Sequence, residues 1–147
     1  MAATLAVASV DRFVKNFITT YPARSGVIAA GWLNFRVAAN AGLAFSLPFP
    51  RGMVPGLSSG VILAFSWWWL LAYRRRDGLQ ISALTAILGG ASSNLLDRLR
   101  WGHVVDYLDV PWFSVFNLAD VLISVGVGLL IMQELIRWLQ GRRKTAV

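Results

Sequence analysis

The sequence predicts a mainly α-helical membrane protein with four transmembrane helices and a small extracytoplasmic β-containing segment between the first and second helices. Hydrophobic residues make up 56% of the chain, charged residues only 14%, and the mean hydropathy is +0.59. The apolar residues gather in long segments, and basic residues cluster at the ends of two of these segments. A soluble domain usually has about a quarter of its residues charged, so this composition does not suit a water-soluble globule.

Four spans are expected at about residues 3–21, 57–73, 79–97 and 118–137, within one integral membrane domain that covers residues 1–147. A transmembrane helix needs about 20 apolar residues, and about 17 are enough for a short span. Residues 57–73 are uncharged, residues 79–96 are uncharged, and residues 118–136 carry only Asp120 and Glu134. These three segments are therefore long and apolar enough to cross a bilayer.

The first span begins with the apolar stretch from Met1 to Val10, which is too short to cross a bilayer core of about 30 Å. The helix must therefore continue past Asp11 and Lys15 towards Tyr21. The stretch lacks a basic leading region and an obvious small-residue cleavage site, so we expect an uncleaved helix here. Asp11 and Lys15 are four residues apart and can pair across one helical turn. Their spacing is compatible with a structural ion pair and with a role near the substrate.

Two clusters of basic residues predict the orientation. They follow the second and the fourth span, and they consist of Arg74, Arg75, Arg76, Arg137, Arg142, Arg143 and Lys144. Because basic clusters mark cytoplasmic ends, we expect both termini in the cytoplasm and residues 21–56 and 98–117 outside. This placement also accounts for much of the net charge of +7 without a nucleic-acid partner.

The two outer connections contain candidate strands. Residues 31–47 mix aromatic and β-branched positions, and Pro48, Pro50, Gly52, Pro55 and Gly56 then interrupt regular structure. One or two short strands at the membrane surface are expected before this interruption. In the second connection, the run HVVDYLD places apolar residues around Asp106, which predicts a short strand or an interfacial segment.

The composition also limits the chemistry. The chain has no cysteine and one histidine, His103, so disulfides and thiolate chemistry are excluded and a zinc site would need carboxylates almost alone. His103 itself is expected to be an interfacial residue. We therefore expect no metal and no cofactor.

Five of the seven acidic residues fall on the outer side, and ionisable groups near membrane depth indicate function by default. Asn94 and Asp97 are three residues apart at the outer end of one span, and Asn117 and Asp120 are three apart at the start of the next. This spacing puts each pair on one helix face and, taken alone, favours Asp97 with Asp120 as a carboxylate pair. Helix caps and interhelical contacts explain the same spacing.

The remaining charged residues have simpler interpretations on spacing alone. Asp106 is compatible with an ordinary loop carboxylate, and Arg98 with a structural partner of its neighbour Asp97. Asp77 and Glu134 lie near the expected cytoplasmic ends and are expected to be solvated.

Two carboxylates that share a proton can hydrolyse a peptide bond without a metal or a covalent intermediate. The ionised carboxylate activates water, and the protonated one donates to the carbonyl oxygen. The pair titrates jointly, because the like charges repel.

Five sequence blocks resemble the signature blocks of the lipoprotein signal peptidase family, also called signal peptidase II. They are GGASSNLLDR at 89–98, GHVVDY at 102–107, FNLAD at 116–120, the Asp-x-x-x-Lys block at 11–15 and NAGLAF at 40–45. The blocks follow the order of the family along nearly the whole chain. Ser93 departs from the pattern, because the family usually has glycine at this position.

The resemblance implies an aspartic endopeptidase that removes the signal peptide from diacylglyceryl-modified prolipoproteins at the outer face of the bacterial cytoplasmic membrane. It implies Asp106 and Asp120 as the catalytic pair, in place of the pair that spacing alone favours. It further implies Asp11 and Lys15 as supporting residues. The residues implied to shape the site or bind substrate are Asn40, Gly42, Asn94, Asp97, Arg98, Asn117 and Ala119.

The implied partners are the lipidated prolipoprotein, membrane lipids and globomycin-type inhibitors, and the chain is expected to act as a monomer. Two other classes of function remain open. A small proton or cation transporter would use intramembrane acids but would place them near the middle of the bilayer. A non-catalytic membrane scaffold would use the Asn and Asp residues as helix caps and would tolerate Asp-to-Asn changes.

Overall fold

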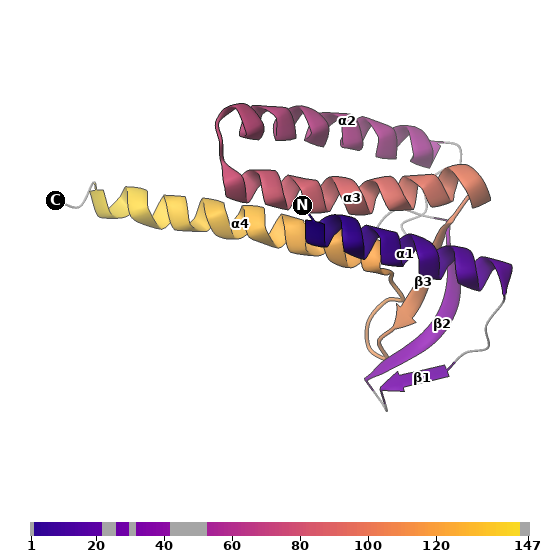
Figure 1. Cartoon of the computed structure of the whole chain (residues 1–147). Coiled ribbons are helices and arrows are strands. Elements are labelled where there is room, and N and C mark those ends of the chain that lie inside the picture. The colour runs from indigo at the N-terminus through magenta and orange to yellow at the C-terminus, as the bar shows by residue number, and fades with distance from the viewer. Residues whose placement is uncertain (1, 22–25, 30–31, 42–52, 145–147) are drawn as a thin grey trace.

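The computed structural model describes residues 2–21, 26–29, 32–41 and 53–144, so Gly42 lies outside the described residues. Figure 1 shows elongated helices side by side, with a small sheet projecting from one end of them. The elements, in chain order, are α1 (Ala2–Thr20), β1 (Gly26–Ala29), β2 (Leu33–Asn40), α2 (Met53–Arg74), α3 (Gly78–Trp101), β3 (Val104–Asp109) and α4 (Leu118–Lys144).

Three helices of the described chain are long and apolar enough to cross a membrane: Met53–Arg74, Gly78–Trp101 and Leu118–Gln140. They correspond to the second, third and fourth predicted spans. The helix α2 begins at Met53, and its first turn contains Pro55 and Gly56. A proline is tolerated there, since the first N–H groups of a helix have no partner within the helix. The expectation that these two residues interrupt regular structure was therefore wrong.

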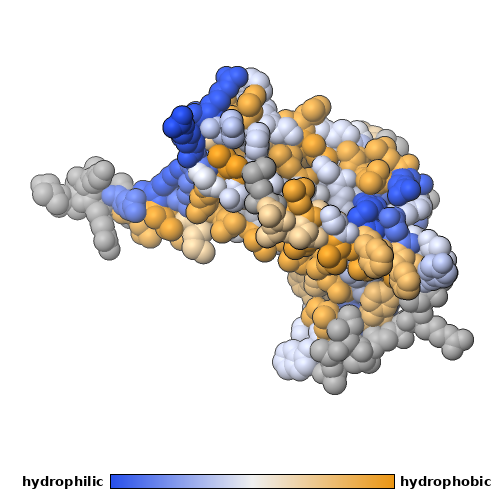
Figure 2. All heavy atoms as spheres, in the orientation of Figure 1, coloured by the Kyte–Doolittle hydropathy of each residue, from blue (hydrophilic) through white to orange (hydrophobic). Residues whose placement is uncertain are grey.

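The helix α1 buries two charged side chains and exposes much of its apolar surface. Asp11 and Lys15 are fully buried, whereas Leu5, Phe13 and Phe17 are exposed. The hydropathy of α1 is lowered by charges that face α3 and α4, and its outer surface is apolar. In Figure 2, hydrophobic residues cover most of the visible middle of the helices.

The helix α3 lies between α2 and α4 (Figure 1) and packs very closely against α4. A Cβ atom added at Gly126 would lie 2.5 Å from the carbonyl oxygen of Ala83 and 2.6 Å from a side-chain carbon of Ile87. One added at Gly90 would collide with the carbonyl oxygen of Ala119. Glycines at these two points therefore let the helix backbones approach each other, as is common between membrane helices.

The sheet has three antiparallel strands in the order β1-β2-β3. The strands β1 and β2 come from the connection between α1 and α2, and β3 comes from the connection between α3 and α4. Only β2 lies within residues 31–47, where one or two strands were predicted, and β1 precedes that range. Asn40 pairs with Val104, and Ala38 pairs with Asp106. Ile18 of α1 packs with Val105 and Tyr107 of β3 in a buried cluster. This contact fixes the sheet against the helices.

The far ends of α3 and α4 are joined through Asp77. Its side chain caps α3 by accepting from the Gln80 N–H at 3.0 Å, and it accepts from Gln133 and from Arg137 of α4. The hydrogen bond from Gln80 lowers the pKa of Asp77, and the bonds from Gln133 and Arg137 lower it further. The expectation of a merely solvated Asp77 was wrong, because sequence proximity to a loop does not reveal a partner on another helix.

Candidate active site

Asp106 lies on β3 with only 2% of its surface exposed. Its Oδ1 accepts a hydrogen bond from Asn117 Nδ2 at 2.6 Å, and its Oδ2 accepts one from Asn40 Nδ2 at 3.1 Å. The pairing of β2 with β3 brings Asn40 to this carboxylate although the two residues are 66 positions apart. Asp106 is therefore a buried strand residue, and the ordinary loop carboxylate considered from spacing alone is excluded.

The pKa of Asp106 is raised to about 6, mainly by burial and also by the neighbouring carboxylate of Asp120. The hydrogen bonds from Asn40 and Asn117 act against this rise, because they favour the ionised form. Asp106 therefore holds a proton at a pH where an exposed aspartate is ionised.

Asp120 lies in the first turn of α4, where Asn117 and Asp120 form a reciprocal cap. Asn117 Oδ1 accepts from the Asp120 N–H at 3.0 Å, and Asp120 Oδ2 accepts from the Asn117 N–H at 3.1 Å. This arrangement is a capping box with aspartate in the position of the usual glutamate. The other oxygen of Asp120 accepts from Asn94 Nδ2 of α3 at 2.8 Å.

Asn117 thus contacts both aspartates, through its side-chain amide on Asp106 and its backbone N–H on Asp120. Each carboxylate receives two N–H donors, and the two groups are close enough for one to affect the titration of the other. The two residues implied by the family resemblance therefore converge in space. No spacing rule alone joins them, because one lies on a strand and the other on a helix.

Spacing alone favoured Asp97 as the partner of Asp120, but the structure gives Asp97 other partners. Its carboxylate is fully buried and accepts from Arg12 at 2.6 Å and from Lys15 at 2.9 Å. The Val105 N–H also points to it, at 3.4 Å. Asp97 is neutralised by two cations from α1, because this face of α3 is turned toward α1.

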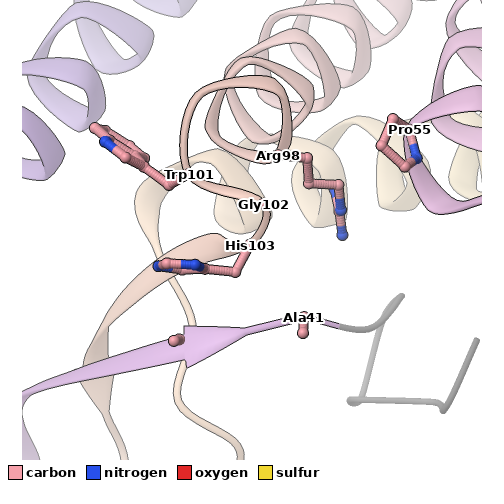
Figure 3. A pocket seen from close by; sticks show the side chains of 7 residues that line it. Ala41, Pro55, Arg98, Trp101, Gly102 and His103 are labelled. Atoms are coloured by element: carbon pink, nitrogen blue, oxygen red, sulfur yellow. The ribbon is translucent and has the colours of Figure 1, made fainter. Parts of the chain in front are cut away.

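Arg98 is not confined to its neighbour Asp97. Its positive charge interacts with the carboxylates of Asp120 and Asp106 as well as with that of Asp97. In Figure 3 its side chain extends into a pocket of about 490 Å³. The pocket is lined by Ala39, Ala41, Pro55, Arg98, Trp101, Gly102 and His103. Arg98 therefore connects this pocket with the surroundings of both aspartates.

Asp11 and Lys15 form the ion pair that their spacing predicts, with 2.9 Å between Oδ2 and Nζ. Lys15 also donates to Asn94 Oδ1 at 2.9 Å. An ammonium group can only donate, so this contact directs the NH₂ group of Asn94 towards Asp120. The Asp11–Lys15 ion pair is therefore linked to Asp120 through Asn94.

Ala119 is fully buried at the start of α4, and its N–H points to Asp11 Oδ1 at 3.3 Å. Its carbonyl oxygen lies against Gly90 of α3. A larger side chain at this position would have little room, which explains a small residue beside the two aspartates.

Three residues near the site were not predicted to belong to it: Arg12, Ser93 and Tyr107. Arg12 Nη2 donates to the carbonyl oxygen and the hydroxyl of Ser93, at 2.6 and 2.9 Å. Ser93 in turn donates to Asp11 at 2.7 Å, and so does Tyr107 at 3.0 Å. For Ser93, the departure from the family glycine was a usable signal. Arg12 and Tyr107 had none, because each lies beside a more conspicuous motif residue.

In the described part of the chain, no group of three or more His, Asp or Glu side chains is arranged to hold a metal ion. The site instead offers two adjacent carboxylates, amide donors that orient them and an arginine nearby. This arrangement suits proton transfer to and from a polar substrate group.

The fold and this pair of carboxylates match what is expected of a membrane-embedded hydrolase of the aspartic type. The sequence model described as signal peptidase (SPase) II matches residues 3–136. The chain belongs to the signal peptidase II family, a family of membrane aspartic peptidases.

Individual relatives agree with this assignment. The lipoprotein signal peptidases of Mesorhizobium japonicum and Cupriavidus necator are each 36% identical to this chain, over 141 and 148 residues. These alignments cover 91% and 93% of this chain and 83% of each relative. A solved bacterial membrane enzyme structure is similar with a TM-score of 0.75 at 22% identity, and covers 92% of this chain and 88% of that one. This last similarity concerns the fold alone.

Proposed function

We propose that this signal peptidase II family member removes the signal peptide from diacylglyceryl-modified prolipoproteins and that Asp106 and Asp120 activate the attacking water. The observation that carries the proposal is the bridge made by Asn117, which donates to both carboxylates. A scaffold that only needed to cap α4 would require Asn117 and Asp120 and would have no use for a buried Asp106.

In the proposed reaction, the pair holds one proton. The ionised carboxylate takes a proton from water while the water oxygen bonds to the scissile carbonyl carbon, and the protonated carboxyl donates to the carbonyl oxygen. The tetrahedral intermediate then collapses and the C–N bond breaks. The leaving amine takes up the proton that came from water, and the hydroxyl formed on the carbonyl oxygen returns its proton to the other carboxylate, which restores the singly protonated pair. The protons balance, and no cofactor is required.

The neighbouring residues receive roles from their contacts. Asn40 and Asn117 would hold Asp106, and Asn94 would hold Asp120. Arg98 would face the substrate from the pocket, while Asp97, Asp11, Lys15 and Ala119 would support the outer ends of the helices. Gly42 keeps its proposed contact with substrate from the family resemblance.

We further propose that α1 is a fourth transmembrane helix. Its apolar residues are exposed, and its buried charges are paired with α3, which removes the usual objection to charge at membrane depth. With four spans, the basic clusters at Arg74–Arg76 and near the end of α4 support a topology with both termini in the cytoplasm. The aspartates, at the opposite end of α3 and α4, then face outward, near the acyl chains of a lipidated substrate. The enzyme would act as a monomer, among lipids, and would be inhibited by globomycin-type compounds.

The test is cleavage of a diacylglyceryl-modified prolipoprotein by the purified chain in detergent. We expect Asp106→Asn and Asp120→Asn each to abolish cleavage, with unfolding temperatures close to that of the parent chain. Glu134→Gln is the control, because Glu134 is exposed and pairs only with the nearby Arg137 in the described contacts. An inactive parent chain would argue against this substrate class. If both the parent chain and Asp106→Asn cleave the substrate, the peptidase assignment holds, but Asp106 and Asp120 are not the catalytic pair.

A further inference from the structure

The hydroxyl of Tyr107 lies where three elements meet. It donates to Asp11 Oδ1 of α1 at 3.0 Å and accepts from the Leu118 N–H of α4 at 3.3 Å, while its own backbone belongs to β3. The residue is only 3% exposed. Burial raises the pKa of Tyr107 above its usual value, so the hydroxyl keeps its proton and remains a donor to Asp11.

Packing explains why an aromatic ring stands at position 107, but it does not explain why the ring carries a hydroxyl. The ring packs with Ile18 and Val105 and lies 6.2 Å from the ring of Phe35. A phenylalanine would fill this space equally well. A hydroxyl buried among apolar residues costs free energy unless its hydrogen bonds are made, so its function is to be sought in those bonds.

The acceptor of this hydroxyl is itself held from several sides. Asp11 Oδ1 also receives the Ala119 N–H at 3.3 Å, and Asp11 Oδ2 receives Ser93 at 2.7 Å and Lys15 at 2.9 Å. Four donors from α1, α3, β3 and α4 converge on one carboxylate, which can accept about four hydrogen bonds. Asp11 is therefore a rigid anchor for the Tyr107 hydroxyl.

The two elements joined by this hydroxyl are those that carry the aspartates. Asp106 precedes Tyr107 on β3, and Asp120 follows Leu118 by two residues on α4. A shift of β3 relative to the start of α4 would change the separation of the two carboxylates. Reaction rates depend steeply on such separations.

We propose that Tyr107 is a positioning residue whose hydroxyl sets the distance between Asp106 and Asp120 by tying β3 to the start of α4 through Asp11. The role rests on the proposed function of the two aspartates. Tyr107 does not contact the substrate in this proposal.

The test compares the parent chain with Tyr107→Phe and with Tyr73→Phe, each purified in detergent. Tyr73 is a matched control, because it lies on α2 and is 60% exposed. Two quantities are measured: kcat and KM for prolipoprotein cleavage per folded protein, and hydrogen–deuterium exchange of the peptide that contains Leu118 and Ala119. In Tyr107→Phe we expect kcat to fall by about tenfold to a hundredfold, KM to stay within about twofold of the parent, and exchange at the start of α4 to accelerate.

Several outcomes would overturn the proposal. Parent-like kcat in Tyr107→Phe would show that the hydroxyl does not position the pair, and a rise in KM alone would assign it to substrate binding. If the parent chain does not cleave, the proposed function fails. The exchange measurement then tests separately whether Tyr107 ties β3 to the start of α4. Parent-like exchange in Tyr107→Phe would show that it does not.

Discussion

At the scale of single residues, the cap and the site use the same side chains. Asn117 and Asp120 form the capping box of α4, and the same two residues present an amide to Asp106 and a carboxylate beside it. A helix start is a stable place for a carboxylate, because the helix dipole favours negative charge there. The cap interpretation of the Asn-x-x-Asp spacing is therefore correct for Asn117 and Asp120. Their role in the site stays a proposal that is compatible with the cap.

The raised pKa of Asp106 predicts how activity depends on pH. Its pKa is about 6, above the ordinary value of 3.8, so the pair keeps a proton at pH 5 and loses it as the pH rises through about 6. Once both carboxylates are ionised, none can donate to the carbonyl oxygen. We expect kcat/KM to fall on the alkaline side of about pH 6, measured as a full pH profile of cleavage. A profile that stays flat to pH 8 would show that the pair does not share a catalytic proton.

Lys15 is a fully buried cation between two carboxylates. It contacts Asp11, Asp97 and Asn94, all within 2.9 Å. Lys15→Met should lower the free energy of unfolding by about 3–5 kcal/mol, because two buried carboxylates lose their shared partner. Arg75→Met, which removes an exposed cation, should change it by less than about 0.5 kcal/mol. Chemical unfolding in mixed micelles measures both, and equal effects would contradict the buried network.

At the scale of elements, the close contact between α3 and α4 sets the depth at which Asn94 meets Asp120. Gly126 faces Ala83 and Ile87 at this contact, whereas Gly128 has no atom within 4 Å of an added Cβ. Both glycines lie on α4, so they form a matched pair in which helix propensity is the same and only the packing differs.

Gly126→Ala should therefore destabilise the protein by about 1–3 kcal/mol through overpacking. Gly128→Ala should leave the stability unchanged or raise it by up to about 1 kcal/mol, because alanine favours the helix. Thermal unfolding in detergent, with cleavage activity measured in parallel, distinguishes the two variants. A parent-like Gly126→Ala would show that the two helices can separate without loss of stability.

At the scale of the whole molecule, charge is separated along the helices. The site acids and their cations lie at one end, and the Arg74–Arg76 cluster lies at the other. Exposed Trp32 and Trp112 extend from the sheet end, with their rings 6.0 Å apart in an edge-to-face contact. The molecule thus has a sheet end and a basic end, which are expected to face opposite sides of the membrane.

This orientation can be measured directly, because the chain has no cysteine. A membrane-impermeant maleimide applied to intact spheroplasts should label Trp112→Cys, and it should label Arg75→Cys only after the membrane is permeabilised. Both positions are exposed, so local burial does not separate them. Labelling of Arg75→Cys in intact spheroplasts would reverse the proposed topology.

The amino-acid sequence by itself determined the membrane class, three apolar helices, the strands around the site and the family, because hydropathy and motif order are local properties. The ion pair of Asp11 with Lys15 also followed from helical spacing. Only the tertiary structure decided that Asp97 belongs to Lys15 and Arg12, that Asn94 serves Asp120, and that Tyr107 and Ser93 converge on Asp11. These contacts join residues from different helices and strands. Their geometry depends on how closely α3 packs on α4 and on where β3 meets α1. Residue spacing along the chain does not determine either of these.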